Sequence, residues 1–183
     1  MTDFALETNR LTIRKFNVDD ANDLHEYLSL PETYIFEPGE PVDRKQALAM
    51  CKERAAGNNF YAVELISEKK MVGHLYFQQA QPVEFMTWEL GYIFNPNYQG
   101  KGYCTEAAQK IIAYAFTTMN AHKVTAFCNP KNIASWRVLE KCGMIREGHF
   151  KEKAFFRRDA DGNPLWFDCF AYGMLKKDFF NNL

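Results

Sequence analysis

Apolar and polar residues alternate along several short runs of the chain, a pattern typical of half-buried β-strands. The first run contains Leu11 and Ile13. Three runs in the middle of the chain are separated only by turns and a short loop, so we expect an antiparallel meander. These three cover residues 60–66, 71–77 and 88–94, and later strand-like runs cover 123–128, 145–156 and 165–174.

The apolar spacing changes to three and four residues after the run 88–94, which predicts a long central helix. One face of this helix carries Ala108, Ile111, Ile112, Ala115, Phe116 and Met119. A second, shorter helix is predicted over 134–141 and ends at Gly143. Because the runs 88–94 and 123–128 flank the central helix, we expect them to lie parallel and adjacent.

Two helices are also predicted near the start of the chain. Asp19 or Asp20 can cap the first, which stops at Pro31. Asp43, with Gln46 three residues later, resembles a capping box at the start of the second.

A loop with two glycines, residues 98–106 (YQGKGYCTE), leads into the central helix. The first N–H groups of a helix lack intrahelical acceptors and lie at the positive end of its dipole, so they bind phosphate well. Gly100 and Gly102 allow the main chain to approach an anion without an intervening Cβ, and Lys101 adds a positive charge. The loop is therefore a candidate phosphate site.

Two common nucleotide-binding loops do not match this sequence. A P-loop requires Gly-x-x-x-x-Gly-Lys-Ser/Thr, and the residues following Gly102 do not supply it. A dinucleotide fingerprint requires a third glycine where this chain has Thr105. Binding of ATP or NAD at the loop stays open as an alternative.

Residues 99–104 (QGKGYC) resemble instead the Gln/Arg-x-x-Gly-x-Gly/Ala pyrophosphate loop of the GNAT (GCN5-related) N-acetyltransferases, with Cys104 in the last small position. Other stretches resemble the RimJ/RimL-type branch of that superfamily and occur in the right order along nearly the whole chain. They are residues 8–16 (TNRLTIRKF), 19–21 (DDA), 89–96 (ELGYIFNP), 132–135 (NIAS) and 140–144 (EKCGM).

The resemblance implies an α+β (mixed α/β) fold with a central, mostly antiparallel twisted sheet, one parallel splayed strand pair and helices on both faces. It implies a single N-acetyltransferase domain over residues 1–183. The expected reaction moves an acetyl group from acetyl-CoA, without a metal, to a primary amine. The acceptor is either a protein N-terminal α-amino group, as in the ribosomal-protein type, or a small-molecule amine.

In GNAT enzymes the pantetheine arm of acetyl-CoA lies between the two splayed strands. The resemblance therefore assigns the cofactor to the end of the run 88–94, to the glycine loop and to one asparagine. The expected cofactor-binding residues are Tyr92, Ile93, Phe94, Gln99, Gly100, Lys101, Gly102, Tyr103, Cys104, Thr105 and Asn132.

Two residues are candidates for catalysis. Glu89 can take a proton from the amine, directly or through water, or it can serve as a structural carboxylate. Ser135 matches a serine that lies near the sulfur in the RimJ/RimL-like pattern and can donate to the leaving thiolate, although Asn132 and Ser135 also suit helix capping. Many GNAT enzymes carry a tyrosine four residues beyond this serine, where this chain has Leu139. A non-catalytic acyl-CoA-binding module is therefore the alternative function.

The acceptor is expected near residues 34–41, a loop with two prolines and a glycine that lines the acceptor cleft in this family. Glu37 or Glu40 in this loop can attract a cation. Nearby aromatic residues either form an acceptor pocket or fill the core, as aromatic residues more often do; they are Tyr34, Phe36, Trp88 and Tyr92.

The composition narrows the class of protein and of ligand. The 183 residues are 47% hydrophobic and 25% charged, which suits one globular core, and no leader or membrane-spanning run is evident. We expect a cytoplasmic monomer or homodimer, and a net charge of −1 argues against nucleic acid as the main ligand. The five cysteines and four histidines lack metal-ligand or disulfide spacing. Cys104, at a helix start beside Lys101, is expected to have a lowered thiol pKa if it is exposed.

Overall fold

The computed structural model describes residues 4–181. Its strands are β1 (Ala5–Glu7), β2 (Leu11–Lys15), β3 (Phe60–Leu65), β4 (Lys70–Gln79), β5 (Thr87–Phe94), β6 (Lys123–Cys128), β7 (Ile145–Arg158) and β8 (Pro164–Leu175). Its α-helices are α1 (Ala21–Leu28), α2 (Arg44–Ala56), α3 (Tyr103–Thr117), α4 (Ile133–Lys141) and α5 (Lys176–Asn181). Short 3₁₀ turns occur at Val18–Asp20, Pro31–Tyr34, Val83–Phe85 and Pro96–Tyr98.

The eight strands form one sheet in the order β1-β2-β3-β4-β5-β6-β8-β7. Every neighbouring pair is antiparallel except β5 and β6, which are parallel. The expected α+β architecture, the meander of β3, β4 and β5, and the parallel pair on either side of α3 are therefore confirmed.

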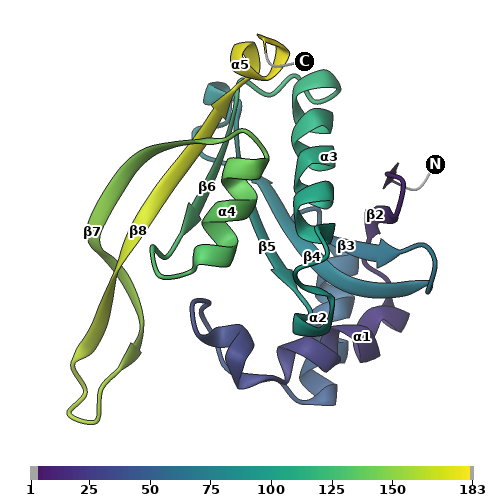
Figure 1. Cartoon of the computed structure of the whole chain (residues 1–183). Coiled ribbons are helices and arrows are strands. Elements are labelled where there is room, and N and C mark those ends of the chain that lie inside the picture. Colours follow the sequence, from purple (N-terminus) through teal and green to yellow (C-terminus); the bar gives the residue numbers. More distant parts are fainter. Residues whose placement is uncertain (1–3, 182–183) are drawn as a thin grey trace.

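Helices cover both faces of the sheet (Figure 1). Met71 and Val72 are successive residues of β4, so their side chains point to opposite faces. Val72 packs in the larger core together with Ile111 of α3, whereas Met71 packs in a smaller core together with Leu24 of α1 and Cys51 of α2. The sheet thus separates α3 from the α1–α2 pair.

The parallel pairing of β5 with β6 is short. It joins only Thr87 to Lys123, Trp88 to Val124, and Glu89 to Thr125. Beyond these residues β5 pairs only with β4, and β6 pairs only with β8. The two strands therefore diverge, as the resemblance implied, and a gap widens between them toward the first turn of α3 (Figure 1).

Two capping predictions have different outcomes. The capping box of α2 is confirmed, because Asp43 Oδ1 accepts from Gln46 N at 2.8 Å and Gln46 Oε1 accepts from Asp43 N at 2.8 Å. At α1, Asp20 occupies the expected N-cap position, but its side chain makes no capping hydrogen bond to the helix. Asn17 caps the preceding 3₁₀ turn instead, and the carboxylate of Asp20 is held by the guanidinium of Arg14 at 2.7 and 2.9 Å.

Three features of the secondary structure were not expected. Gln78 and Gln79, predicted to lie in a loop, continue β4 because they pair with Glu89 and Trp88. β1 and α5 were missed because three and six residues are too few to show a period. Within residues 4–181, no helix is both long and apolar enough to cross a membrane.

Candidate active site

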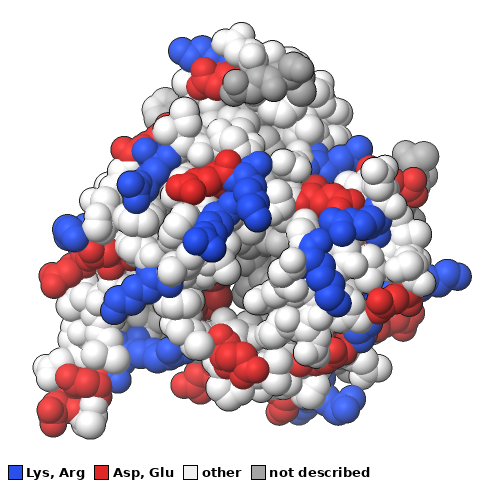
Figure 2. All heavy atoms as spheres, viewed as in Figure 1, with Lys and Arg blue, Asp and Glu red and all other residues white. Residues whose placement is uncertain are grey.

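A cavity of about 540 Å³ lies where β5 and β6 diverge. Its walls come from residues 92–94 of β5, from residues 96–105 around the start of α3, from α4 and its N-cap, and from residues 32–37. The face shown in Figure 2 is hollowed near its centre, and Lys and Arg side chains border the hollow. This volume lies within the range of about 300–1,000 Å³ that is usual for small-molecule sites.

The glycine loop exposes main-chain N–H groups to this cavity. Gly100 and Gly102 have φ angles of +74° and +82°, a region that favours glycine, and a Cβ on Gly100 would meet nothing within 4 Å. The first intrahelical bond of α3 runs from Glu106 N to Gly102 O at 3.0 Å. The N–H groups of residues 103–105 precede that bond, and all three residues line the cavity. The geometry suits an anion at the start of α3.

Side chains from the turn between β1 and β2 hold this loop in place. Arg10 Nε donates to Glu106 Oε2 at 2.7 Å, and Arg10 Nη1 donates to the carbonyl of Lys101 at 3.0 Å. Thr8 Oγ1 donates to Glu106 Oε1 at 2.6 Å. Burial alone would raise the pKa of Glu106, but the hydrogen bonds from Thr8 and Arg10 and the charge of Arg10 lower it. Sequence analysis placed Thr8 and Arg10 in a matching stretch but gave them no role.

Gln99 and Lys101 differ in position. The side chain of Gln99 lines the cavity, and its Nε2 donates to the carbonyl of Phe94 at 3.1 Å, which ties the loop to the end of β5. Lys101 is not among the lining residues, and its Nζ lies 5.0 Å from the centre of the Tyr98 ring. Cations that do line the cavity belong to α4, and sequence analysis missed them because their spacing resembles an ordinary exposed helix face. They are Arg137 and Lys141.

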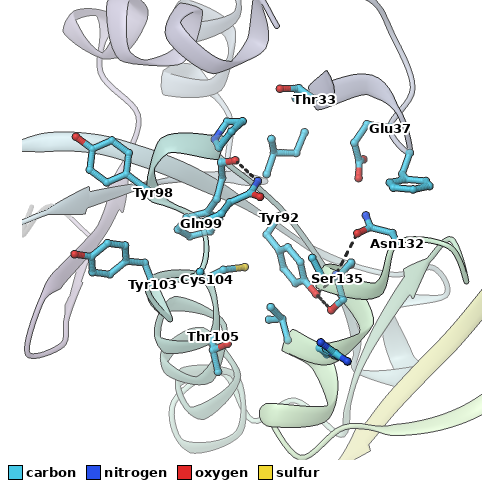
Figure 3. A pocket seen from close by; sticks show the side chains of 18 of the residues that line it. Thr33, Glu37, Tyr92, Tyr98, Gln99, Tyr103, Cys104, Thr105, Asn132 and Ser135 are labelled. Carbon is cyan, nitrogen blue, oxygen red and sulfur yellow. Dashed lines mark hydrogen bonds between the residues drawn. The ribbon is translucent and has the colours of Figure 1, made fainter. Parts of the chain in front are cut away.

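The first turn of α4 brings two candidate residues together (Figure 3). Asn132 Oδ1 accepts from Ser135 N at 3.2 Å, so the asparagine caps α4 and also lines the cavity. Ser135 Oγ donates to Tyr92 Oη at 3.3 Å, and Tyr92 Oη donates to the carbonyl of Ser135 at 2.8 Å. Burial raises the pKa of Tyr92 well above its ordinary value of 10, so the phenol keeps its proton at neutral pH.

Two carboxylates that could accept a proton have different surroundings. Glu89 is half-buried at the last paired position of β5 and β6, and it lines neither this cavity nor the smaller one beside it. Burial raises its pKa. Glu37 lines both cavities, and in Figure 3 its carboxylate points toward Asn132. Burial raises the pKa of Glu37 to about 7.

Two further positions, Leu139 and Cys104, bear on expectations from the sequence. Leu139 is 1% exposed and belongs to the larger core, so no side chain at this position of α4 reaches the cavity here. The lowered pKa expected for an exposed Cys104 does not occur, because burial of the thiol raises its pKa well above the ordinary value of 9. All five cysteines are free thiols.

Comparison with known proteins decides the family. The sequence model described as Acetyltransferase (GNAT) domain matches residues 10–145 of the chain. The chain belongs to the GNAT acetyltransferase family. A GNAT-family acetyltransferase from Bacillus anthracis, solved by crystallography, is 35% identical with a TM-score of 0.86, and the match covers 95% of this chain and 99% of that one. The chain is thus an acyltransferase of known architecture.

Relatives of this GNAT protein include N-acetyltransferases. The uncharacterized N-acetyltransferase YnaD of Bacillus subtilis (strain 168) is 37% identical over 174 residues, which cover 94% of this chain and 98% of the relative. The ribosomal protein uS5-alanine N-acetyltransferase of Escherichia coli (strain K12) is 29% identical over 158 residues, which cover 80% of this chain and 81% of that enzyme.

GNAT acetyltransferases take their acetyl group from acetyl-CoA, and the donor set suits its parts. Helix-terminal N–H groups and the α4 cations suit phosphates, while the unpaired edge of β5 suits the amide groups of pantetheine. Among residues 4–181, no cluster of three or more His, Cys, Asp and Glu side chains is arranged to hold a metal ion.

Proposed function

We propose that this GNAT protein is an acetyl-CoA-dependent N-acetyltransferase of the RimJ/RimL-type branch, with a primary amine as acceptor. One observation carries the proposal: a single cavity joins the first turn of α3 to the hydroxyl of Ser135 through the gap beside β5. Ten of the eleven residues expected to bind the cofactor line this cavity, and the exception is Lys101. The proposal treats residues 1–183 as one acetyltransferase domain.

The reaction requires three proton movements. The acceptor ammonium loses one proton, and the neutral nitrogen then forms a bond to the thioester carbon while the carbon–sulfur bond breaks. The nitrogen loses a second proton to become an amide, and the sulfur gains a proton to leave as a thiol. We propose Ser135 Oγ as the donor to sulfur, for which its hydroxyl turns away from Tyr92 Oη. Glu89 stays a candidate for the first proton, although it lines neither cavity.

The acceptor is a protein N-terminal α-amino group or a small-molecule amine. The relative that acetylates ribosomal protein uS5 supports a protein N-terminus as acceptor. The smaller cavity beside Ser135, which few charged groups line, supports a small-molecule amine. A reaction that consumes acetyl-CoA also favours the cytoplasmic location expected from the sequence.

Two measurements test the proposed function. Thermal unfolding with CoA, acetyl-CoA and ATP checks the ligand, since a ligand at 100 times its Kd adds about 2.7 kcal/mol to the unfolding free energy. We expect CoA to raise Tm and ATP to leave it unchanged. A rise in Tm with ATP but not with CoA would reject the assignment of acetyl-CoA as the cofactor. Thiol release from acetyl-CoA with a panel of amines then separates an enzyme from a non-catalytic CoA-binding module, which would be stabilised by CoA without turnover.

A further inference from the structure

A second cavity, of about 320 Å³, adjoins the first. Both cavities are lined by Phe36, Glu37, Asn132 and Ser135. The first cavity extends from this shared boundary to the glycine loop, and the second extends to the β7–β8 hairpin. A molecule in the second cavity would therefore meet the acyl end of a molecule in the first beside Ser135.

Four phenyl rings from four elements line the second cavity. Phe36 comes from the loop after the Pro31–Tyr34 turn, Phe127 from β6, Phe156 from β7 and Phe167 from β8. The rings of Phe156 and Phe167 lie 4.7 Å apart, yet Phe127 and Phe156 remain 46% and 44% exposed. Exposed rings that converge on a cavity are typical of a site for an apolar ligand.

The position of the loop wall is fixed from the hairpin. The guanidinium of Arg157 on β7 donates to the main-chain carbonyl of Tyr34. The phenol of Tyr34 is buried and donates to the carbonyl of Leu28 at 3.0 Å, which anchors the same loop to α1. The cavity is therefore held between two anchored walls and is largely formed before a ligand binds.

The charged side chains that line this cavity are few. Within the described residues, Glu37 is its one carboxylate and Lys153 its one cation. A single carboxylate can accept a single ammonium group. A second ammonium on the same ligand would find no carboxylate on this wall and would meet the positive charge of Lys153, so this charge pattern disfavours polyamines.

We propose, on the basis of the function above, that the second cavity binds the acceptor, and that this acceptor is a primary amine on an aromatic body with no second positive charge. Glu37 accepts the first proton of its ammonium group, and that proton then passes to solvent. The neutral nitrogen attacks the thioester carbon held beside Ser135, the carbon–sulfur bond breaks, and the second nitrogen proton leaves as the sulfur is protonated. A free arylalkylamine and the N-terminal aromatic residue of a peptide share this chemistry.

Thiol release with three acceptors tests the substrate class: 2-phenylethylamine, a peptide that begins with phenylalanine, and spermidine. We expect kcat/KM to be about tenfold or more higher for the better aromatic acceptor than for spermidine, because a buried aromatic ring favours binding. The better of the two aromatic arms identifies the source. Equal or better use of spermidine would overturn the inference and leave the proposed function intact, whereas acetylation of no amine would overturn both.

Matched variants test the two walls. Phe156→Ala should raise KM for 2-phenylethylamine about tenfold and leave KM for spermidine unchanged. Phe150→Ala is the control, since Phe150 is 46% exposed on the same strand but does not line the cavity. An equal effect of both substitutions would overturn the placement of the acceptor.

A second pair tests the proton acceptor. Glu37→Gln should lower kcat about 100-fold or more without a loss of Tm, whereas Glu40→Gln, in the exposed part of the same loop, should match the parent. Glu89→Gln is the competing variant. A larger loss of kcat in Glu89→Gln than in Glu37→Gln would return the role of proton acceptor to Glu89.

Discussion

Ser135 Oγ donates a hydrogen bond to Tyr92 Oη at 3.3 Å, and the same phenol donates to the carbonyl of Ser135 at 2.8 Å. The pair joins β5 to the first turn of α4 across the gap in the sheet. Leu139, where many family members carry a tyrosine, is buried in the larger core. Tyr92 therefore supplies, from another element, the aromatic hydroxyl that fixes the orientation of the serine.

Removal of either hydroxyl should change kcat more than KM for acetyl-CoA, because a proton donor to sulfur is needed mainly in the transition state. Ser135→Ala should lower kcat by about 10²- to 10⁴-fold. Tyr92→Phe should lower kcat less, about tenfold, since it removes the hydrogen bond that holds the carbonyl of Ser135, and with it the first turn of α4, beside β5. In the double variant the effect of Tyr92→Phe should disappear, and fully additive losses would show that Tyr92 acts independently of Ser135.

Two glycines allow a matched test of the phosphate site. Gly100 and Gly162 have φ angles of +74° and +85°, and an added Cβ would meet no atom within 4 Å at either position. Alanine should therefore cost a similar roughly 1–2 kcal/mol of backbone strain at each. Only Gly100 lines the cavity, so Gly100→Ala should weaken CoA binding at least about tenfold while Gly162→Ala should not. Equal CoA affinity in both variants would place the phosphates elsewhere.

Much of the fold could be predicted because its signals are local. The period of α3, the capping box at Asp43 and the left-handed glycines of the loop all depend on residues close in sequence. The long-range contacts could not be derived in this way. Arg10 reaches Glu106 across 96 positions of the chain, and nothing in either neighbourhood indicates that pairing.

Burial is the main reason why some site predictions did not follow from sequence. A thiol at a helix start has a lowered pKa only where water or a cation is near, whereas half-buried Cys104 has its pKa raised by burial. The same cause distinguishes Glu37 from Glu40: both lie in one acidic loop, but only Glu37 lines the cavities. Sequence shows which residues are acidic, whereas the packing of β7 and α4 decides which one is enclosed.

Cys104 should therefore react slowly with alkylating reagents, in contrast to the expectation from sequence. Burial raises its pKa, so the reactive thiolate is scarce at pH 7 to 8. Mass spectrometry after a timed treatment with iodoacetamide measures the modified fraction at each cysteine, with unfolded protein in urea as the reference for full reactivity. Rapid alkylation of Cys104 in the folded, ligand-free protein would show that the thiol is open to solvent.

The raised pKa of Glu37 should appear in the stability of the ligand-free protein. Burial raises this pKa from 4.5 to about 7 in the folded chain, so between these values the folded state holds the proton more strongly than the unfolded state. The unfolding free energy contributed by this group therefore falls as pH rises from about 4.5 to about 7, and is constant above that. Glutamine cannot ionise, so the free energy of unfolding of Glu37→Gln should rise by roughly 1–3 kcal/mol relative to the parent across this window.

Urea unfolding of the parent, Glu37→Gln and Glu40→Gln at several pH values measures this difference, in which the contributions of the other titrating groups cancel. A difference between Glu37→Gln and the parent that stays constant from pH 4 to pH 8 would show that the carboxylate of Glu37 is well solvated.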